Sequence, residues 1–367
     1  MNNVVLVSRF NTNNIGDVVI ANALREELEK TQNVQPVSLF GAPQPQPFSF
    51  PIISYDGTVK SGVINKAFRK VEVKKQLIKI RKGNADIVFG GGNMLCDLNP
   101  SSHSTFRYKP YIECGGEKKM SAIDIGIGPF FNDEQKREAV DLLDHMNVIT
   151  FRDKSSMELY QSNGGSSPCY LSVDPAFFFN HKGNKRTALH HTIGINIMNA
   201  GLIRTQKGVF EKICSQYLNL GIALNKELGV EVNYFVTDQA DALALSYING
   251  HIENSGLKTV YIKGIQDLLD FYDGIDLLIG TRMHSMILGY SRYLPIIGIT
   301  WQQKIVDMFE MLEINDRLFD FDEFGNYIGN IVDLAAMIYG NMQLEQNQIG
   351  GGYALMEYRR SSCYKEV

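Results

Sequence analysis

Short, continuous apolar runs alternate with segments of helical periodicity along most of the chain, and this alternation constrains the fold more than any other feature. The apolar runs of the first half cover residues 4–7, 86–89, 122–127, 148–151 and 170–173. Those of the second half cover residues 193–197, 231–236, 260–262, 276–279 and 296–299. Continuous apolar strands separated by helices are typical of parallel sheets that are buried on both faces. The pattern therefore predicts an α/β protein with two doubly wound, Rossmann-like domains that face each other across a cleft.

The length of the chain and one polar segment predict where the domains begin and end. A chain of 367 residues is longer than one hydrophobic core usually supports. Residues 181–190 are polar and show no apolar periodicity, as expected for a linker. We therefore expect a first domain over 1–180, a second domain over 191–333, and a C-terminal helix and tail over 334–367. No element is predicted beyond the three glycines at 350–352.

Charge, hydropathy and cysteine spacing exclude several classes of protein. A formal net charge of −4 gives no general reason to expect nucleic acid as a partner. The chain has no run of about 18 apolar residues that would span a bilayer, and its first residues do not have the pattern of a signal peptide. The five cysteines are scattered without CxxC spacing, so we expect reduced, mostly buried thiols in a cytoplasmic protein.

Five loops are the candidate functional regions, because open parallel sheets bind ligands at the carboxyl ends of their strands. These loops cover residues 10–17, 90–97, 128–132, 152–155 and 280–285. Each contains polar residues, glycines or cations, and we expect them to converge in the cleft.

The first two loops contain candidate ligand-binding residues of small size. Asn14, Gly16 and Asp17 precede or begin a helix, where small polar residues either cap the helix or leave its first N–H groups free for an anion. Asp17 could be a general acid or base, or could only neutralise the helix dipole. In the second loop Gly91, Gly92 and Asn93 permit a close approach of the backbone to a ligand, or a tight turn. They do not form the GxGxxG pattern of dinucleotide-binding proteins. These residues are therefore candidates for binding the substrate.

Two further segments that follow apolar runs contain candidate cations. Arg152 follows an apolar run directly, and its guanidinium suits a carboxylate or a phosphate, although it could instead form a structural pair with Asp153 or Asp174. Lys304, after the last apolar run of the second half, is either a further cation of the site or a surface lysine. Both residues are candidates for binding an anionic substrate.

The stretch Gly280-Thr281-Arg282-Met283-His284-Ser285 is the most informative of these loops. An arginine that binds an anion beside a histidine that moves a proton is a catalytic pairing. Arg282 and His284 would point the same way if the turn is extended, and Thr281 or Ser285 could cap a helix expected over 286–291. The chain shows no metal-ligand spacing, no phosphate-binding loop and no Gly-x-Ser-x-Gly motif, so no metal or cofactor is expected.

Several of these stretches together resemble the polysaccharide pyruvyl transferase family. The matching pieces span residues 4–310 in the expected order: Asn14-Ile15-Gly16-Asp17, Phe89-Gly90-Gly91-Gly92, Arg152-Asp153-Lys154-Ser155-Ser156, Asp174-Pro175-Ala176 and Gly280-Thr281-Arg282-Met283-His284-Ser285. The resemblance implies a GT-B-like fold and a transferase that uses phosphoenolpyruvate to place a ketal-linked pyruvate on a sugar. The Arg-x-His element of that family is associated with phosphoenolpyruvate, which implies this role for Arg282 and His284.

The resemblance also implies a scheme for the reaction. Arg152, Arg282 and Lys304 would bind the donor, His284 would be the acid, and Asp17 or Asp174 would be the base. The acceptor would be a sugar of a cell-surface polysaccharide, such as an exopolysaccharide, or of its lipid-linked precursor. Two alternatives stay open, because fold does not determine function. One is a nucleotide-sugar glycosyltransferase of the same fold, and the other is a non-catalytic glycan- or nucleotide-binding protein.

Residues 60–82 are the most basic segment of this acidic chain. They contain nine Lys or Arg residues against one acid, Glu72. The apolar residues of the segment recur at three- and four-residue spacing and predict one or two amphipathic helices: Val63, Ile64, Ala67, Phe68 and Val71. This stripe either packs on the first domain or, with its cations, makes a peripheral contact with the inner membrane surface.

Overall fold

The computed structural model describes residues 2–39, 52–55, 62–179, 189–204, 206–253 and 255–364, without the side chains of 62–69. Of the predicted linker over 181–190, residues 181–188 lie outside the described residues. The strands before this linker form one sheet, and the strands after it form a second sheet.

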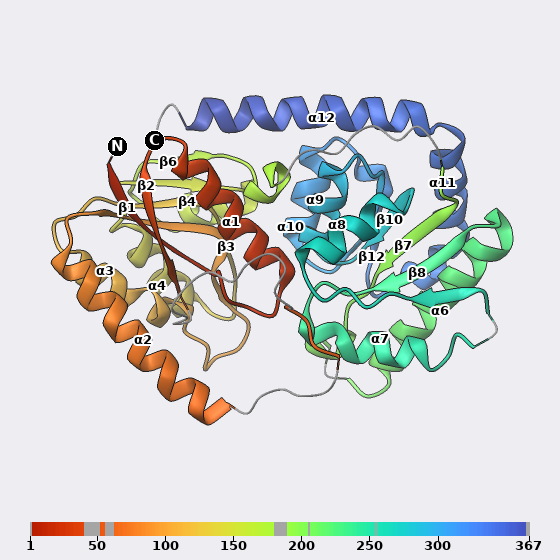
Figure 1. Cartoon of the computed structure of the whole chain (residues 1–367), viewed down its shortest axis with the longest axis horizontal. Helices are drawn as coiled ribbons and strands as arrows, with labels where there is room; N and C mark the ends of the chain where they lie inside the picture. The colour runs from red at the N-terminus through yellow and green to blue at the C-terminus, as the bar shows by residue number, and fades with distance from the viewer. Residues whose placement is uncertain are drawn as a thin grey trace.

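Two six-stranded parallel sheets form the frame of the molecule (Figure 1). The first has the order β2-β1-β3-β4-β5-β6 and the second the order β12-β11-β10-β7-β8-β9. The strands are β1 (Asn3–Ser8), β2 (Asn33–Ser38), β3 (Asp86–Asp97), β4 (Met120–Phe130), β5 (Val148–Phe151), β6 (Cys169–Leu171), β7 (Thr192–Asn196), β8 (Glu231–Phe235), β9 (Leu257–Thr259), β10 (Leu277–Gly280), β11 (Ile296–Thr300) and β12 (Leu318–Asp320). The strand order reverses between β1 and β3 and between β7 and β10, and such reversals open the crevices in which doubly wound sheets bind ligands.

The connections between the strands are mostly helical, which confirms the predicted pair of doubly wound domains. The α-helices are α1 (Ile15–Glu29), α2 (Gly62–Lys82), α3 (Lys109–Gly115), α4 (Asp133–Leu143), α5 (Lys154–Ser162), α6 (Val209–Leu228), α7 (Ala242–Asn249), α8 (Ile265–Asp273), α9 (Met283–Ser291), α10 (Gln303–Met311), α11 (Ile328–Gly340) and α12 (Met342–Cys363). Short 3₁₀ helices include η1 (Ser104–Arg107) and η2 (Pro175–Phe178). Within the described part of the chain, no helix is long and apolar enough to cross a membrane.

Several element boundaries differ from the sequence predictions. β3 does not end before the glycines but continues through them to Asp97, because Gly91 and Gly92 adopt φ angles of 70° and 79° and let the strand bend without leaving the sheet. β9 lies over Leu257–Thr259 rather than 260–262, and α9 begins at Met283 rather than at residue 286. The sequence analysis missed five elements altogether: β2, β12, α3, α4 and α10.

The first helix belongs to the hydrophobic cores of both domains. Ile15, Val18 and Val19 of α1 are fully buried in the same cluster as Ile195 and Ile279 of the second sheet. Asn14 caps this helix, since its side chain accepts a hydrogen bond from the backbone N–H of Asp17 (3.3 Å). The amino end of α1 is therefore fixed at the junction between the domains.

The chain ends in α12, which returns to the first domain along the top of Figure 1. The predicted domain boundary between 333 and 334 falls inside α11. Glycines 350–352 do not interrupt α12, and a Cβ atom at Gly352 would overlap the hydroxyl of Tyr290. At the far end the Tyr364 hydroxyl donates to Asp124 (2.6 Å), so the end of the chain is attached to the first domain.

All five cysteines are free thiols, as predicted. The expectation that most of them are buried is wrong, because only Cys214 and Cys363 are, whereas Cys96, Cys114 and Cys169 are half-buried.

Candidate functional site

The two domains meet where the loop after β1 touches the loop after β8. The backbone N–H of Ile15 donates to the carbonyl of Thr237 (3.0 Å), and that of Gln239 donates to the carbonyl of Asn13 (2.9 Å). The Asn14 amide also donates to Asp238 (2.6 Å). The polar side chain of Asn14 is therefore engaged by a helix cap and by a bond between the domains, and it closes one side of the cleft.

A group of three residues lies between the two domains, two of them buried and the third, His284, half-buried. Nη1 of Arg152 is 2.5 Å from Oδ2 of Asp174 and 2.9 Å from Nε2 of His284. The same carboxylate oxygen is 3.4 Å from Nε2 of His284. Arg152 and Asp174 belong to the first domain and His284 to the second, so this group joins three of the sequence candidates across the cleft.

Local structure fixes both members of the first-domain ion pair. Arg152 follows β5 directly, and its backbone N–H donates to the carbonyl of Ile125 on the neighbouring strand (2.9 Å). Asp174 caps η2, with Oδ1 accepting from the N–H of Ala176 (2.9 Å). Burial alone raises the pKa of Asp174, but Arg152 and His284 outweigh it and hold this pKa well below its usual range. Asp174 is therefore ionised at neutral pH.

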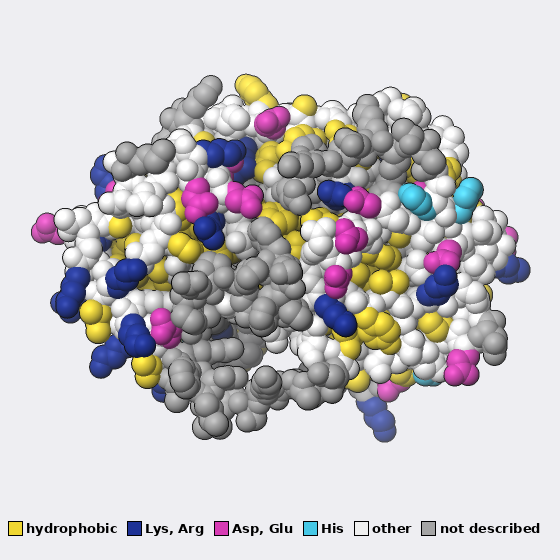
Figure 2. All heavy atoms as spheres, viewed as in Figure 1, with side chains coloured by type: hydrophobic (Ala, Val, Ile, Leu, Met, Phe, Trp, Pro, Cys, Tyr) yellow, Lys and Arg dark blue, Asp and Glu magenta, His cyan; other side chains and the backbone are white. Residues whose placement is uncertain are grey.

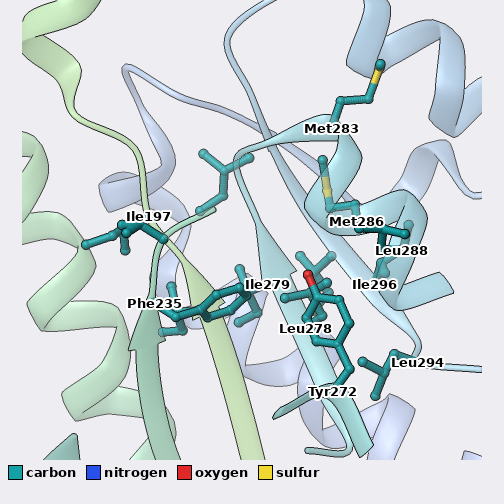
Figure 3. Packing of buried hydrophobic residues seen from close by; sticks show 14 of the residues in the cluster. Ile197, Phe235, Tyr272, Leu278, Ile279, Met283, Met286, Leu288, Leu294 and Ile296 are labelled. Atoms are coloured by element: carbon teal, nitrogen blue, oxygen red, sulfur yellow. The ribbon is translucent and has the colours of Figure 1, made fainter. Parts of the chain in front are cut away.

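His284 lies in the first turn of α9, which hydrophobic packing holds firmly in place. Met286 and Leu288 of α9 pack beside Leu278 of β10 in the core of the second domain (Figure 3). On its other side His284 lies against Gly16, where an added Cβ would be only 2.6 Å from Nδ1 of the ring. Gly16 is thus the residue that lets the amino end of α1 approach the histidine.

The contact with Arg152 indicates the tautomer of His284. A guanidinium only donates hydrogen bonds, so Nε2 of the ring accepts in this geometry. The proton of the neutral ring therefore resides on Nδ1.

Lys304 is a second buried cation near this group. It lies at the start of α10, is 6% exposed, and its Nζ donates to Oδ1 of Asn93 (2.5 Å). An added Cβ at Gly126 would be 2.9 Å from Nζ of Lys304 and 3.1 Å from Nε of Arg152, so the two cations converge on this glycine. Burial lowers the pKa of Lys304 to about 8. The expectation that Lys304 could be a surface lysine is therefore wrong.

Lys304→Met is expected to raise the free energy of unfolding by about 2 kcal/mol at pH 7. A pKa lowered from 10.5 to about 8 corresponds to a burial cost of about 3 kcal/mol, and the lost hydrogen bond to Asn93 is worth about 1 kcal/mol. Because the folded-state pKa is depressed, the gain is full below pH 8 and shrinks as the pH rises toward 10.5. Urea denaturation of both proteins across this range measures it.

The matched control for this variant is Lys154→Met, at an exposed lysine near the same cleft, which should leave stability unchanged. Loss of stability in Lys304→Met at pH 7 would mean that neighbouring carboxylates outweigh the burial cost of this lysine.

Arg282 bonds carboxylates of its own domain and does not join the group of Arg152, Asp174 and His284. It occupies the N-cap position of α9, and its Nε and Nη2 donate to the buried carboxylate of Asp241 (2.7 and 2.8 Å). Nη2 is also 3.7 Å from Asp238, which bonds Asn14. Arg282 is therefore held at the domain junction by two carboxylates that the sequence analysis did not single out.

Thr281 and Ser285 are not brought to the cleft surface. Both are fully buried, and their hydroxyls bond those of Tyr217 (2.6 Å) and Tyr272 (2.8 Å) inside the second domain. Neither caps α9, because no side chain makes a capping bond at that helix. The prediction that one of them caps the helix is wrong.

The remaining sequence candidates surround an arginine that the sequence analysis missed. Arg9 lies 3.4 Å from Asp17 and donates to the backbone carbonyl of Asn93 (2.8 Å). Burial lowers the pKa of Arg9, but Asp17 and Tyr108 outweigh it, and the pKa lies above its usual value. Its position immediately after β1 was the signal that could have identified it, since Arg152 follows β5 in the same way.

The glycines of the second loop have separate roles. A Cβ at Gly91 would overlap Ile20 of α1, so this glycine permits close packing of strand and helix. Gly92 faces Asp17, because an added Cβ would be 3.8 Å from Oδ1 of that residue. Of the two, Gly92 is the one beside a polar group of the site.

A cavity of about 730 Å³ opens from the buried cations between the two domains. Arg152, Asp174 and Lys304 line one side of it, and apolar side chains line much of the rest: Leu171, Phe177, Met283, Ile287, Met308 and Met311. Nε of Arg152 and Oδ2 of Asp153, also at this floor, are buried 3.7 Å apart, and neither has a hydrogen-bond partner in the described part of the chain. Two buried cations beside an apolar wall, Arg152 and Lys304, give the cavity the features of a binding site for an anion.

Two doubly wound domains with a site between them define the GT-B class of fold. Similar solved structures are S. aureus MnaA with UDP, an alpha-glucosyltransferase with UDP-glucose and DNA, and the UDP-GlcNAc 2-epimerase of Methanocaldococcus jannaschii with UDP-GlcNAc and UDP. Their TM-scores are 0.56, 0.55 and 0.54, at 11%, 11% and 10% sequence identity. The alignments cover 95%, 100% and 90% of this chain, and 91%, 98% and 93% of the other chains. Identities this low show the fold alone.

The family is shown by the sequence itself. Residues 14–303 match the model of the polysaccharide pyruvyl transferase family, and the chain belongs to that family. No protein of curated function is significantly similar to it in sequence. The protein is therefore a transferase of the polysaccharide pyruvyl transferase family with a GT-B fold.

Proposed function

We propose that this protein transfers the pyruvyl group of phosphoenolpyruvate to two hydroxyls of a sugar, with which it forms a ketal. The observation that carries the proposal is the convergence of Arg152 and Lys304 at the floor of one cavity, with His284 in contact with Arg152, in a chain of this family. Two buried cations suit a ligand with two anionic groups, and phosphoenolpyruvate carries a carboxylate and a phosphate.

The three cations differ in how far other protein groups already bind them. Arg152 is bound to Asp174 through Nη1, while its Nε lies 3.7 Å from Asp153 and makes no hydrogen bond among the described residues. Lys304 contributes a positive charge whose burial cost an anion would relieve. Arg282, which lies two residues before His284 in the chain and is held by Asp241, contributes a further positive charge. In the proposal Arg152 and Lys304 bind the donor directly, and Arg282 adds to the positive potential.

The proposed reaction balances without a redox partner. A proton is added to the methylene carbon of phosphoenolpyruvate, which becomes the methyl group of the product. Two sugar hydroxyls form C–O bonds to the second carbon and lose their protons, and the C–O bond to phosphate breaks. One hydroxyl proton replaces the proton used on the methylene, and the other leaves with hydrogen phosphate.

His284 is the proposed acid and Asp17 the proposed base. His284 is the histidine whose Nε2 lies 2.9 Å from Arg152 and 3.4 Å from Asp174, and histidine is the side chain that most often serves as a general acid. Asp174 was the other candidate base, but its strongly lowered pKa makes it a poor proton acceptor, so we assign it to orienting Arg152 and His284. Asp17 directly follows Gly16, and Gly16 lies against the ring of His284.

The proposed acceptor is a hexose of a cell-surface glycan, such as an exopolysaccharide, or of its lipid-linked precursor. The volume of the cavity leaves room for a sugar beside the donor, and its apolar wall suits the carbon face of a sugar ring. The free thiols fit a cytoplasmic location, which is part of the proposal.

Incubation with phosphoenolpyruvate and a panel of hexose-terminated oligosaccharides is expected to release inorganic phosphate only when a suitable acceptor is present. Phosphoenolpyruvate at about 100 times its Kd should also stabilise the protein by about 2.7 kcal/mol, which thermal unfolding detects. Release of UDP or GDP from a nucleotide sugar would instead identify a glycosyltransferase. Ligand binding without release of either product would support the non-catalytic alternative.

A further inference from the structure

Helix α2 presents two opposite faces whose chemistry differs. Its inner face packs on the first domain through Val73, Leu77 and Ile80, of which Ile80 is fully buried. The hydroxyl of Tyr111 on α3 donates to Gln76 (3.3 Å), which fixes this orientation further. The rotation of the helix about its axis is therefore determined over residues 70–82, where the side chains are described.

The outer face of α2 combines exposed cations with exposed aliphatic side chains. It consists of Val71, Lys74, Lys75, Ile78, Lys79 and Lys82. Val71 and Ile78, seven residues and so two turns apart, are 55% and 48% exposed. Figure 2 shows dark blue and yellow side chains interleaved at the lower left, where Figure 1 places α2. Both aliphatic side chains face solvent between lysines.

The charge of this segment is opposite to that of the whole protein. Residues 70–82 contain six Lys or Arg residues and one acid, Glu72, in a chain with a formal net charge of −4. Glu72 is 3.7 Å from Lys75 and leaves the other five cations of the segment uncompensated on their own helix. A positive strip on an acidic protein directs that strip toward an anionic surface.

We propose that the outer face of α2 docks the protein on an anionic lipid membrane. The lysines attract the phosphate groups of the lipid headgroups, and Val71 and Ile78 enter the boundary between headgroups and acyl chains. Nucleic acid would also attract the lysines, but two exposed aliphatic side chains contribute nothing to contacts with a phosphate backbone. The surface is independent of the reaction proposed above, because none of the described side chains of α2 lines the cavity.

The apolar residues that carry the docking differ from the stripe read in the sequence. The side chains of Val63, Ile64, Ala67 and Phe68 lie outside the described residues. Ile78 was not part of that stripe, but its side chain is exposed and belongs to the proposed docking face. The two alternatives read in the sequence therefore apply to opposite faces of α2, since one face packs on the first domain and the other is proposed to contact the membrane.

The test measures binding of the whole protein to vesicles without any turnover. The wild-type protein is expected to sediment at low salt with vesicles of phosphatidylcholine mixed with phosphatidylglycerol, and not with phosphatidylcholine alone. Salt should release it, because exposed charges are screened. Reversal of Lys74, Lys75 and Lys82 to Glu should weaken binding at least about 100-fold, since each basic residue near the surface contributes about 1 kcal/mol.

The matched control reverses three exposed lysines of the second domain, Lys207, Lys212 and Lys226, to Glu. It changes the net charge equally and should keep most of the binding. Val71→Ser combined with Ile78→Ser should weaken vesicle binding at least about 10-fold, because it removes the apolar insertion. All of these variants should keep the phosphate release of the wild type on a soluble acceptor.

Three outcomes would overturn the proposal. The wild-type protein could ignore the anionic vesicles at low salt. The two sets of lysine reversals could weaken binding equally, which would leave only a non-specific effect of net charge. Double-stranded DNA could displace the vesicles while the serine variant binds as the wild type does, which would identify a nucleic-acid surface instead.

Discussion

Replacement of His284 by alanine is expected to lower the turnover number by about 10²–10⁴-fold, the usual contribution of a positioned acid. His284 lies 2.9 Å from Arg152 and 3.4 Å from Asp174 between the two domains, so its removal deletes the proposed proton donor and leaves the ion pair in place. The affinity for phosphoenolpyruvate should change only a few-fold, because the cations are retained. Steady-state release of phosphate and calorimetric titration of the donor measure the two quantities separately.

The control for this variant is His251→Ala, at an exposed histidine just after α7 whose ring bonds the backbone carbonyl of Tyr247 and stacks on the ring of the same residue. It should turn over as the wild type does. Full turnover by His284→Ala would show that His284 only supports the structure and that another group supplies the proton. A proportional loss of donor affinity would instead assign His284 to binding.

The sequence predicts the architecture well because strands that are buried on both faces appear as continuous apolar runs. Each central strand of a doubly wound sheet must be apolar along its whole length, and the strands that follow this rule, such as β4, β7 and β10, were located within a few residues. The strands that were missed lie at sheet edges. β2 contains Pro36 and is only partly buried, and β12 has three residues, so neither shows a continuous apolar run.

Glycines misled the sequence analysis where tertiary contacts decide their conformation. Glycines 90–92 suggested the end of a strand, yet β3 continues because these positions pack against α1. Glycines 350–352 suggested the end of a helix, yet α12 passes through them, with Gly352 against the Tyr290 hydroxyl. In both places the glycine permits a close approach between segments distant in sequence, which local propensity does not reveal.

For the site, the sequence identified most residue positions and named Asp153 and Asp174 as possible partners of Arg152, both of which contact it, but it did not identify the partners of Arg282. Position at the carboxyl end of a strand was enough to select Arg152, and position after the last central strand selected Lys304. Nothing in the sequence indicates that Arg282 bonds Asp241, forty-one residues earlier, rather than standing beside His284. Ion pairs between distant segments depend on how the two sheets face each other, and they have no spacing that a single sequence displays.

Arg152→Met is expected to lower the free energy of unfolding by about 3–5 kcal/mol at pH 7, the cost of leaving one member of a buried ion pair alone. Arg152 and Asp174 have side chains only 3% and 4% exposed, so water cannot replace the lost partner. In the wild type the pKa of Asp174 is depressed, so its contribution is present above the unfolded-state pKa and is lost as the pH falls through the folded-state value.

In the Arg152→Met variant the sign of this pH dependence is reversed. Without its cation the buried carboxyl has a raised pKa, so the penalty is full above that raised value and disappears as the pH falls to about 4, near the unfolded-state pKa. The difference in stability between wild type and variant should therefore shrink on acidification. Urea denaturation at a series of pH values measures it, and a difference that grows toward low pH would contradict the assigned pairing.

The double variant Arg152→Met/Asp174→Asn separates the structural role of Arg152 from its proposed role in binding. Asparagine removes the buried charge, so most of the lost stability should return. Donor affinity should not return, because a charge-assisted contact with phosphoenolpyruvate, about 1.5–3 kcal/mol or roughly 10–150-fold in Kd, is still missing. If both stability and donor affinity were restored, Arg152 would serve only to neutralise Asp174, and Lys304 and Arg282 would have to bind the donor without it.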